Sequence, residues 1–251
     1  MERDSLVSII MPAYNCEKFI SKSIFSVISQ SYNFWELIIC DDASTDNTVR
    51  EIKEIADRDS RIKVLVNACN KGPAFSRNRA LDYASGDLVA FLDSDDVWYS
   101  DFLSLQLDFL MSLNVNAVFS SYSRVNENGQ RVLSDFIVPS RVSYTDILKT
   151  NSISCLTVLL KRRLIGETRM SETGIEDINF WLDLLKKESF FYGNKEVLAS
   201  YTIRKSSRSR SKVKLIQPQW KTYRECQQLS AIASFYYLCN WAVRGFLKNL
   251  R

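Results

Sequence analysis

The chain has 251 residues, 46% of them hydrophobic, with only seven glycines and four prolines, so its composition excludes a disordered or collagen-like protein. The net charge of +4 is too small to indicate nucleic-acid binding by itself. Histidine is absent, which excludes Ser-His-Asp triads, Cys-His dyads and His-ligated zinc and leaves carboxylates as the candidate acid–base groups.

The first half of the chain alternates strand-like and helix-like segments. Short apolar runs predict strands at 6–11, 35–40, 61–66 and 88–92, the first of them stopped by Pro12. Apolar residues at helical spacing predict helices over 19–28 and 49–56, and a third helix begins near Pro73, where proline fits the first turn. Continuous apolar strands separated by amphipathic helices predict an α/β fold with a mostly parallel sheet covered on both faces.

The pattern changes after about residue 125. Residues 126–129 have the composition of a hairpin tip, 154–160 and 197–204 read as strands, and 176–187 as a short helix. A serine-rich basic segment covers 204–214, and helix returns from about 218. We therefore divide the chain into a ligand-binding half (1–125), a second half (126–205), and a basic loop with a C-terminal amphipathic helix (206–251).

The cysteines and the N-terminal residues indicate in which cellular compartment the protein is expected. Six cysteines are scattered without a C-x-x-C pair, which is typical of reduced thiols in a cytoplasmic protein. The first five residues are not a cationic stretch leading into an apolar one, so no signal peptide is expected.

Four polar clusters follow directly after predicted strands, at 12–15, 41–46, 67–72 and 93–96. In open α/β sheets ligands bind at this carboxyl edge, so the four clusters together predict a ligand site there.

The acidic run Asp93-Ser94-Asp95-Asp96 carries the strongest chemical signal. Its three carboxylates repel one another, and a hard divalent cation such as Mg²⁺ or Mn²⁺, shared with diphosphate oxygens, relieves that repulsion. The alternative is a helix N-cap, but capping needs one aspartate rather than three.

The other clusters are weaker when taken singly. Asp42 is a candidate to accept hydrogen bonds from a base or ribose, while Ser44 to Asp46 would cap the following helix. The run from Asn70 to Asn78 offers backbone N–H groups and Arg77 to a phosphate or sugar, although a solvated arginine is the equal alternative. Glu176 and Asp177 open a helix, where acidic residues also suit the helix dipole, and are the best-placed general base in the second half.

In combination and in order, these features resemble the family 2 glycosyltransferases with the GT-A fold. The resemblance covers about residues 5 to 205 and rests on five stretches: 7–15, 41–46, 70–78, 86–96 and 176–177. It implies an inverting hexosyltransferase-type enzyme that moves one sugar from a nucleotide sugar, with a UDP-sugar as the donor and Mn²⁺ or Mg²⁺ as the cofactor.

The resemblance also implies roles for individual residues. The base of the donor would contact Pro12, Tyr14 and Asp42, and the ribose or nearby loop would contact Asn70, Gly72 and Arg77. Asp93 and Asp95 match the D-x-D pair, which meets the donor and the metal. Asp177 matches the base that deprotonates the acceptor hydroxyl, with Glu176, Trp181 and Asp96 beside the acceptor.

Departures from the family pattern narrow the expectation. The Q-x-x-R-W motif of processive synthases is replaced by Gln217-Pro218-Gln219-Trp220, and multiple apolar spans are missing, which favours transfer of a single sugar. The family's histidine after the last strand is replaced by Arg204 to Arg208, so either arginine is a candidate to close over the diphosphate. By resemblance the acceptor is a glycan or polyprenyl-diphosphate-linked sugar in bacterial cell-surface polysaccharide synthesis.

The C-terminal segment has two interpretations. Residues 226–243 carry no formal charge but include five polar residues, which argues against a spanning helix. An apolar stripe, followed by Arg244, Lys248 and Arg251, suits an interfacial helix on the inner leaflet of the plasma membrane. The stripe consists of Ile232, Phe235, Tyr236, Cys239, Val243, Phe246 and Leu250. Packing on the catalytic domain or on a partner chain is the equal alternative.

Two rival functions have weaker support. A sugar-phosphate nucleotidyltransferase would carry a glycine-rich basic loop after the first strand, which Met11 to Asn15 is not. An RNA-binding module built on 204–214 lacks interleaved aromatic residues, and the acidic clusters would repel phosphate. We therefore expect no nucleic-acid partner.

Overall fold

A computed structural model describes residues 5–204 and 212–249 of the chain. The strands are β1 (Val7–Ala13), β2 (Trp35–Asp41), β3 (Ile62–Val66), β4 (Leu88–Phe91), β5 (Val97–Trp98), β6 (Ala117–Asn126), β7 (Arg131–Phe136), β8 (Arg141–Val142), β9 (Val158–Lys161) and β10 (Phe191–Ile203). The α-helices are α1 (Ile20–Ile28), α2 (Thr48–Ala56), α3 (Pro73–Asp82), α4 (Phe102–Ser112), α5 (Tyr144–Lys149), α6 (Arg162–Ile165), α7 (Glu176–Leu185), α8 (Lys212–Lys221) and α9 (Ala231–Asn249). A 3₁₀ turn, η1 (Cys155–Thr157), precedes β9, and a π-helical segment, η3 (Thr222–Cys226), follows α8.

The ten strands found within residues 5–204 and 212–249 join one sheet, in the order β3-β2-β1-β4-β9-β6-β10-β5, with β7 paired to β6 and β8 to β10. The β1–β2, β2–β3, β1–β4 and β6–β10 pairs are parallel. β9 is antiparallel to both of its neighbours, β4 and β6, so these two strands share one direction. The carboxyl ends of β1, β2, β4 and β10 consequently lie at the same edge of the sheet.

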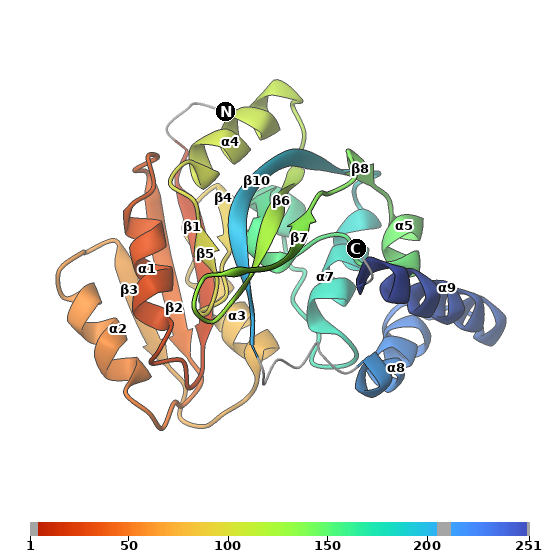
Figure 1. Ribbon diagram of the computed structural model, residues 1–251, viewed down its shortest axis with the longest axis horizontal. Helices are drawn as coiled ribbons and strands as arrows, with labels where there is room; N and C mark the ends of the chain where they lie inside the picture. Colours follow the sequence, from red (N-terminus) through yellow and green to blue (C-terminus); the bar gives the residue numbers. More distant parts are fainter. Residues whose placement is uncertain (1–4, 205–211, 250–251) are drawn as a thin grey trace.

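Helices cover both faces of this sheet (Figure 1). Alternate residues of a strand point to opposite faces, and β1 follows this rule: Val7, Ile9 and Met11 join the core beneath α1, α2 and α4, whereas Ile10 joins the core beneath α3 and α7. The expected α/β architecture, a mostly parallel sheet covered on both faces, is confirmed.

Several element boundaries differ from the expectation. Pro12 does not stop β1, which continues to Ala13, because β4 ends opposite Ile10 and so the missing proline N–H removes no bond to that strand. The strand expected over 154–160 begins only at Val158, after the 3₁₀ turn. β10 begins six residues earlier than expected, at Phe191, and its first residues pair with β8 and with β6.

The second half continues the sheet of the first. β6 spans residue 125 and pairs with β9 and β10, so strands from both sides of the expected division lie in one sheet. The hairpin expected at 126–129 is confirmed: β6 and β7 are antiparallel, and Gly129 takes a positive φ of 78° at the turn. Most of the basic segment 204–214, including Arg208, lies outside the described residues.

The C-terminal helices pack beside the second half. α8, η3 and α9 lie next to α5 and α7, away from α1 and α2 (Figure 1). Tyr223 of η3 is fully buried and donates its hydroxyl to the Leu148 carbonyl at 2.7 Å. None of the helices within 5–204 and 212–249 has the length and apolar character needed to cross a membrane.

Candidate active site

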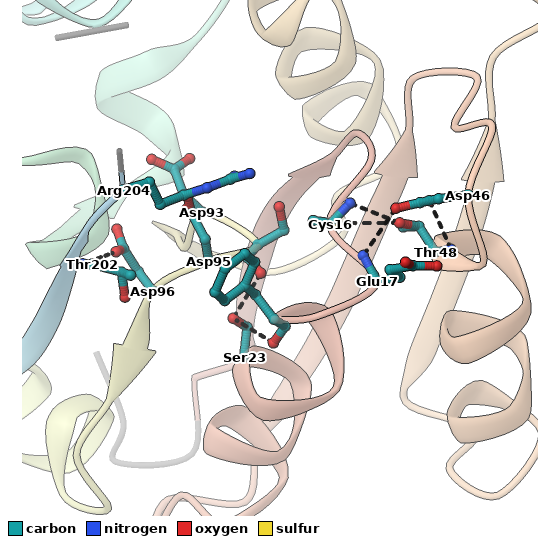
Figure 2. Close-up of polar contacts among 12 residues, drawn as sticks. Cys16, Glu17, Ser23, Asp46, Thr48, Asp93, Asp95, Asp96, Thr202 and Arg204 are labelled. Carbon is teal, nitrogen blue, oxygen red and sulfur yellow. Dashed lines mark hydrogen bonds and ion pairs between the residues drawn. The ribbon is translucent and has the colours of Figure 1, made fainter. Parts of the chain in front are cut away.

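The acidic loop 93–96 lies at the carboxyl edge between β4 and β5, and each of its aspartates has a different partner. The Asp93 carboxylate accepts a hydrogen bond from Arg77 Nη2 at 2.5 Å. Asp95 Oδ2 accepts one from Arg204 Nη1 at 3.1 Å, and Asp96 Oδ1 accepts one from the Thr202 backbone N–H at 2.7 Å. Figure 2 shows the three carboxylates beside the end of β10. Since β5, not a helix, follows, the helix-cap interpretation of this run is wrong.

Negative charge in this loop is only partly compensated. Burial, followed by the charge of Asp93, raises the pKa of Asp95. Burial and the neighbouring aspartates raise the pKa of Asp96 well above its usual range, and Asp96 Oδ2 has no hydrogen-bond partner within the described part of the chain. Three neighbouring carboxylates with only two arginine partners leave negative charge that a hard divalent cation would offset.

The protein does not supply a complete cage for such an ion. Among residues 5–204 and 212–249, no three Asp, Glu or Cys side chains are arranged to hold a metal by themselves. Two carboxylates, Asp93 and Asp95, remain about one quarter to one third exposed, at 30% and 24% of their side chains. A cation here therefore needs further oxygen ligands from a bound molecule, such as a diphosphate.

Arg204 follows the last residue of β10 and is held from two sides. Its guanidinium pairs with Asp95 and also lies over the ring of Phe19, 4.9 Å from the ring centroid. The bond between Asp96 and Thr202 fixes the end of β10 against the acidic loop, which places Arg204 there. The sequence assigned Phe19 no functional role, because it was one of the apolar residues that predicted the helix over 19–28.

Arg77 is buried, with 7% of its surface exposed, and lies between the two halves of the site. Besides Asp93, its Nη1 lies 3.6 Å from the Glu176 carboxylate. Burial, the largest single effect, lowers the pKa of Arg77, but the neighbouring negative groups, Asp93 first among them, together leave this pKa above its ordinary value. The resemblance implies a place for Arg77 beside the ribose or nearby loop, and in this structure the guanidinium lies between the Asp93 and Glu176 carboxylates.

Asp177 lies in the first turn of α7, on the other side of Arg77. Its carboxylate accepts hydrogen bonds from Asn151 Nδ2 at 3.2 Å and from the Ile178 N–H at 2.8 Å. Burial, with a further contribution from the charge of Glu176, raises the pKa of Asp177 to about 6. A carboxyl with that pKa is ionised at neutral pH and is a stronger base than an ordinary aspartate. Asn151 lies in a loop without a motif, and sequence reasoning missed it.

Two residues expected beside the acceptor are buried instead. Trp181 is fully buried, and its ring makes edge contacts with Phe91, Phe180 and Phe191 in the core. Asp96 is 1% exposed. Neither side chain offers surface to an acceptor, so Trp181 supports α7 from beneath and Asp96 fastens β10. Glu176 keeps 30% of its side chain exposed.

The loops after β1, β2 and β3 are tied together. Asp42 is buried, and its carboxylate accepts hydrogen bonds from Asn67 Nδ2 and from the N–H groups of Lys71 and Gly72, at 2.7 to 3.0 Å. Gly72 takes a positive φ of 89° as it enters α3, which glycine does without steric cost.

A second set of bonds links the loop after β1 to the start of α2. Asp46 accepts hydrogen bonds from the N–H groups of Glu17 and Thr48, and the Thr48 hydroxyl accepts one from the Cys16 N–H (Figure 2). The N-cap of α2 is Asn47, which makes no capping bond with its side chain, so Asp46 reaches the first N–H of the helix from the position before the cap. Tyr14 and Asn70 are exposed at this edge, and Pro12 is half-buried, so these three have surface available to a ligand.

Comparisons with known proteins agree with this geometry. The sequence model of "Glycosyl transferase family 2" matches residues 8–163. A relative from Escherichia coli, UDP-Glc:alpha-D-GlcNAc-diphosphoundecaprenol beta-1,3-glucosyltransferase WfgD, is 40% identical over 98% of this chain and 96% of its own. The crystal structure of S. aureus TarS 1–349 in complex with UDP-GlcNAc has a TM-score of 0.72 at 23% identity, covering 96% of this chain and 72% of that one.

A second solved structure, the mannosyltransferase PcManGT from Pyrobaculum calidifontis in complex with GDP-Man and Mn²⁺, has a TM-score of 0.70 at 18% identity. It covers 92% of this chain and 69% of that one. At these identities the two structures show a shared fold, and the expected GT-A fold is confirmed.

Proposed function

This chain belongs to glycosyl transferase family 2, and from that premise we propose that it moves one sugar from a UDP-sugar to a hydroxyl of a polyprenyl-diphosphate-linked glycan, with inversion, in bacterial cell-surface polysaccharide synthesis. The name of the 40% identical relative, which specifies a UDP-glucose donor and a diphosphoundecaprenol-linked acceptor, supports this choice. Near-complete coverage of both chains supports it further.

The donor is proposed to lie along the edge formed by the loops after β1, β2 and β3. Tyr14 and Asn70 offer exposed surface for the base and ribose, and Pro12 lies next to Tyr14. Asp42 acts indirectly, since its carboxylate holds the loop that ends at Gly72. The diphosphate then reaches the acidic loop.

Asp93 and Asp95 are proposed to hold Mn²⁺ or Mg²⁺ together with the donor diphosphate. The residues fit such an ion because their donor atoms are hard oxygens, their charge is incompletely compensated, and Asp96 Oδ2 is buried without a partner among the described residues. When bound, the ion neutralises the charge that develops on the departing nucleoside diphosphate.

Asp177 is proposed to act as the general base. Its carboxylate takes the proton of the acceptor hydroxyl while that oxygen forms a bond to the anomeric carbon and the bond from that carbon to the diphosphate oxygen breaks. The electron pair of the broken bond leaves with the nucleoside diphosphate. One displacement from the opposite face inverts the configuration. Arg77, paired with Asp93 and facing Glu176, keeps the donor and acceptor sides of the site in register.

The observation that carries the proposal is the acidic loop at the sheet edge, which the buried Arg77 connects to Glu176, the residue before Asp177. Two substitutions separate its parts. Asp95→Ala should weaken Mn²⁺-dependent UDP binding in calorimetry, because it removes a metal ligand. Asp177→Ala should retain UDP binding but lose sugar transfer, scored as UDP release from a panel of UDP-sugars with a lipid-linked acceptor. Full turnover by Asp177→Ala would rule out Asp177 as the general base. Equal UDP affinity of the wild type with and without Mn²⁺ would rule out the metal site.

A further inference from the structure

The outer face of α9 carries an apolar stripe that nothing in the described part of the chain covers. Ile232, Phe235 and Val243 expose 85%, 63% and 60% of their surface, and Tyr236 and Cys239 on the same stripe are also exposed. These positions recur at intervals of three, four and seven residues, which places them on one side of a helix.

A different face of α9 holds the helix on the protein. Ser234 is fully buried, and Tyr237 and Leu238 pack against the core that includes α5, α7 and Tyr223. Because Ser234, Tyr237 and Leu238 lie on the side opposite Ile232 and Val243, α9 is anchored without using its apolar stripe. Packing on the catalytic domain therefore does not account for this stripe.

The positive charge of the C-terminal segment indicates which kind of surface could cover the stripe. From Cys226 to the end of the chain there is no Asp or Glu, while Arg244, Lys248 and Arg251 are all cationic. Arg244 is exposed and directly follows Val243, about 100° further around the helix. A second copy of this segment would bring cations against cations, whereas an anionic lipid surface attracts them. Exposed aromatic rings such as Phe235 and Tyr236 also suit the headgroup region.

The position of α9 connects this surface to the catalytic half. α9 packs on α5 and η3, which in turn pack on α7, the helix that begins with Glu176 and Asp177. Gln227, just ahead of α9, donates a hydrogen bond to Asp183 of α7 and accepts one from the Tyr144 hydroxyl of α5. In Figure 1 these helices lie together at one end of the molecule.

We propose that the stripe of Ile232, Phe235, Tyr236, Cys239 and Val243 docks α9 flat on an anionic lipid bilayer, with Arg244 at the headgroups. The docked helix presents the α7 side of the site to an acceptor whose lipid is in the same membrane. This deepens, and rests on, the proposed use of a lipid-linked acceptor.

Vesicle flotation tests the docking directly, using the full chain without donor or acceptor. The wild type should float with phosphatidylcholine vesicles that contain phosphatidylglycerol and much less with phosphatidylcholine alone. The triple variant Ile232→Ser, Phe235→Ser, Val243→Ser should reduce the bound fraction by about tenfold or more, because interfacial binding scales with buried apolar area.

A matched variant controls for the loss of exposed apolar surface in general. Phe25, Tyr83 and Ile137 are exposed to 56%, 55% and 54% and lie outside α9, and changing all three to serine should leave flotation unchanged. Circular dichroism and melting temperature of both variants establish that each remains folded. Equal flotation of the α9 variant and the wild type would overturn the proposal. The proposal would also be overturned if the wild type did not bind vesicles and light scattering showed a dimer that the α9 substitutions disrupt.

Activity assays separate this proposal from the proposed function. Transfer to a short, detergent-free soluble acceptor analogue should be the same in the wild type and the α9 variant, whereas transfer to an acceptor embedded in vesicles should fall in the variant. If the wild type transfers sugar but does not bind vesicles, the membrane docking is refuted and the transferase assignment stands. If the wild type binds vesicles but releases UDP from no UDP-sugar, the transferase assignment is refuted and the membrane docking is still supported.

Discussion

Replacing Asp177 by asparagine should inactivate the protein and stabilise its fold at the same time. The substitution keeps the shape of the side chain and an oxygen that can accept from the Ile178 N–H, but removes the charge. Transfer should fall by about 10² to 10⁴-fold, the usual contribution of a general base. Stability should rise while activity falls, because the raised pKa of this carboxyl shows that its ionised form destabilises the folded state.

The magnitude comes from the difference between 3.8, the ordinary value, and about 6, the pKa of Asp177 in the folded chain. At about 1.4 kcal/mol for each tenfold change in proton affinity, the ionised carboxylate costs the fold about 3 kcal/mol at pH 8. The folded state binds the proton more tightly, so this cost is absent below pH 3.8, grows between 3.8 and about 6, and is constant above. At pH 5 it is about half as large.

Urea unfolding of the wild type and Asp177→Asn at pH 8 and pH 5 measures the effect. The variant should gain about 3 kcal/mol at pH 8 and about half of that at pH 5, while Asp57→Asn, at an exposed position after α2, should change neither stability nor turnover. Wild-type kcat/KM should rise with pH around 6 as the base ionises. Equal stability of variant and wild type at pH 8 would refute the idea that the fold holds this partly buried carboxylate in its charged form at a cost in stability.

Three further outcomes follow from the contacts around the site. Arg204→Gln removes the partly exposed ion pair between Arg204 and Asp95. The affinity for Mn²⁺ without nucleotide, measured by electron paramagnetic resonance titration, should therefore rise by about two- to fivefold. An unchanged affinity would mean that Arg204 does not compete with the metal ion for Asp95. Arg77→Met leaves the Asp93 and Glu176 carboxylates without their shared cation, so the free energy of unfolding measured with urea should fall by about 3 kcal/mol. The double variant Arg77→Met, Asp93→Asn should regain part of that free energy, because it removes one of the two unpaired charges. Gly193→Ala would place a methyl group 2.0 Å from the Pro139 carbonyl oxygen, so it should lower the free energy of unfolding by about 2 kcal/mol or more; a smaller loss would show that the loop yields.

Local pattern predicted the elements of the first half well. The apolar runs that end at Met11, Cys40, Val66 and Leu92 are strands within one or two residues, because strands buried on both faces are apolar throughout. Predictions were poorer after residue 125. The start of β10 lies in Phe191 to Glu196, where polar and apolar residues mix, and only its pairing with β6 and β8 makes this stretch a strand.

For the site, the sequence identified the groups and the structure decided which of them face a ligand. Asp93 and Asp95 were identified from the motif and lie at the expected edge with partly exposed carboxyls, and Asp177, identified by resemblance, lies in the first turn of α7 with a raised pKa. The same motif could not show that Trp181 and Asp96 point into the protein, because burial depends on the strands and helices that pack around them.

Composition and chain order by themselves determined the α/β class, the absence of histidine chemistry and the acidic run at a strand end, since these are properties of the covalent chain and of its local periodicity. Only the tertiary structure decided that Arg77 joins Asp93 to Glu176, that Arg204 reaches Asp95 across 109 positions, and that the stripe of α9 faces outward. Those contacts join residues far apart in sequence. Their distances are set by strand order and helix packing, which no local pattern specifies.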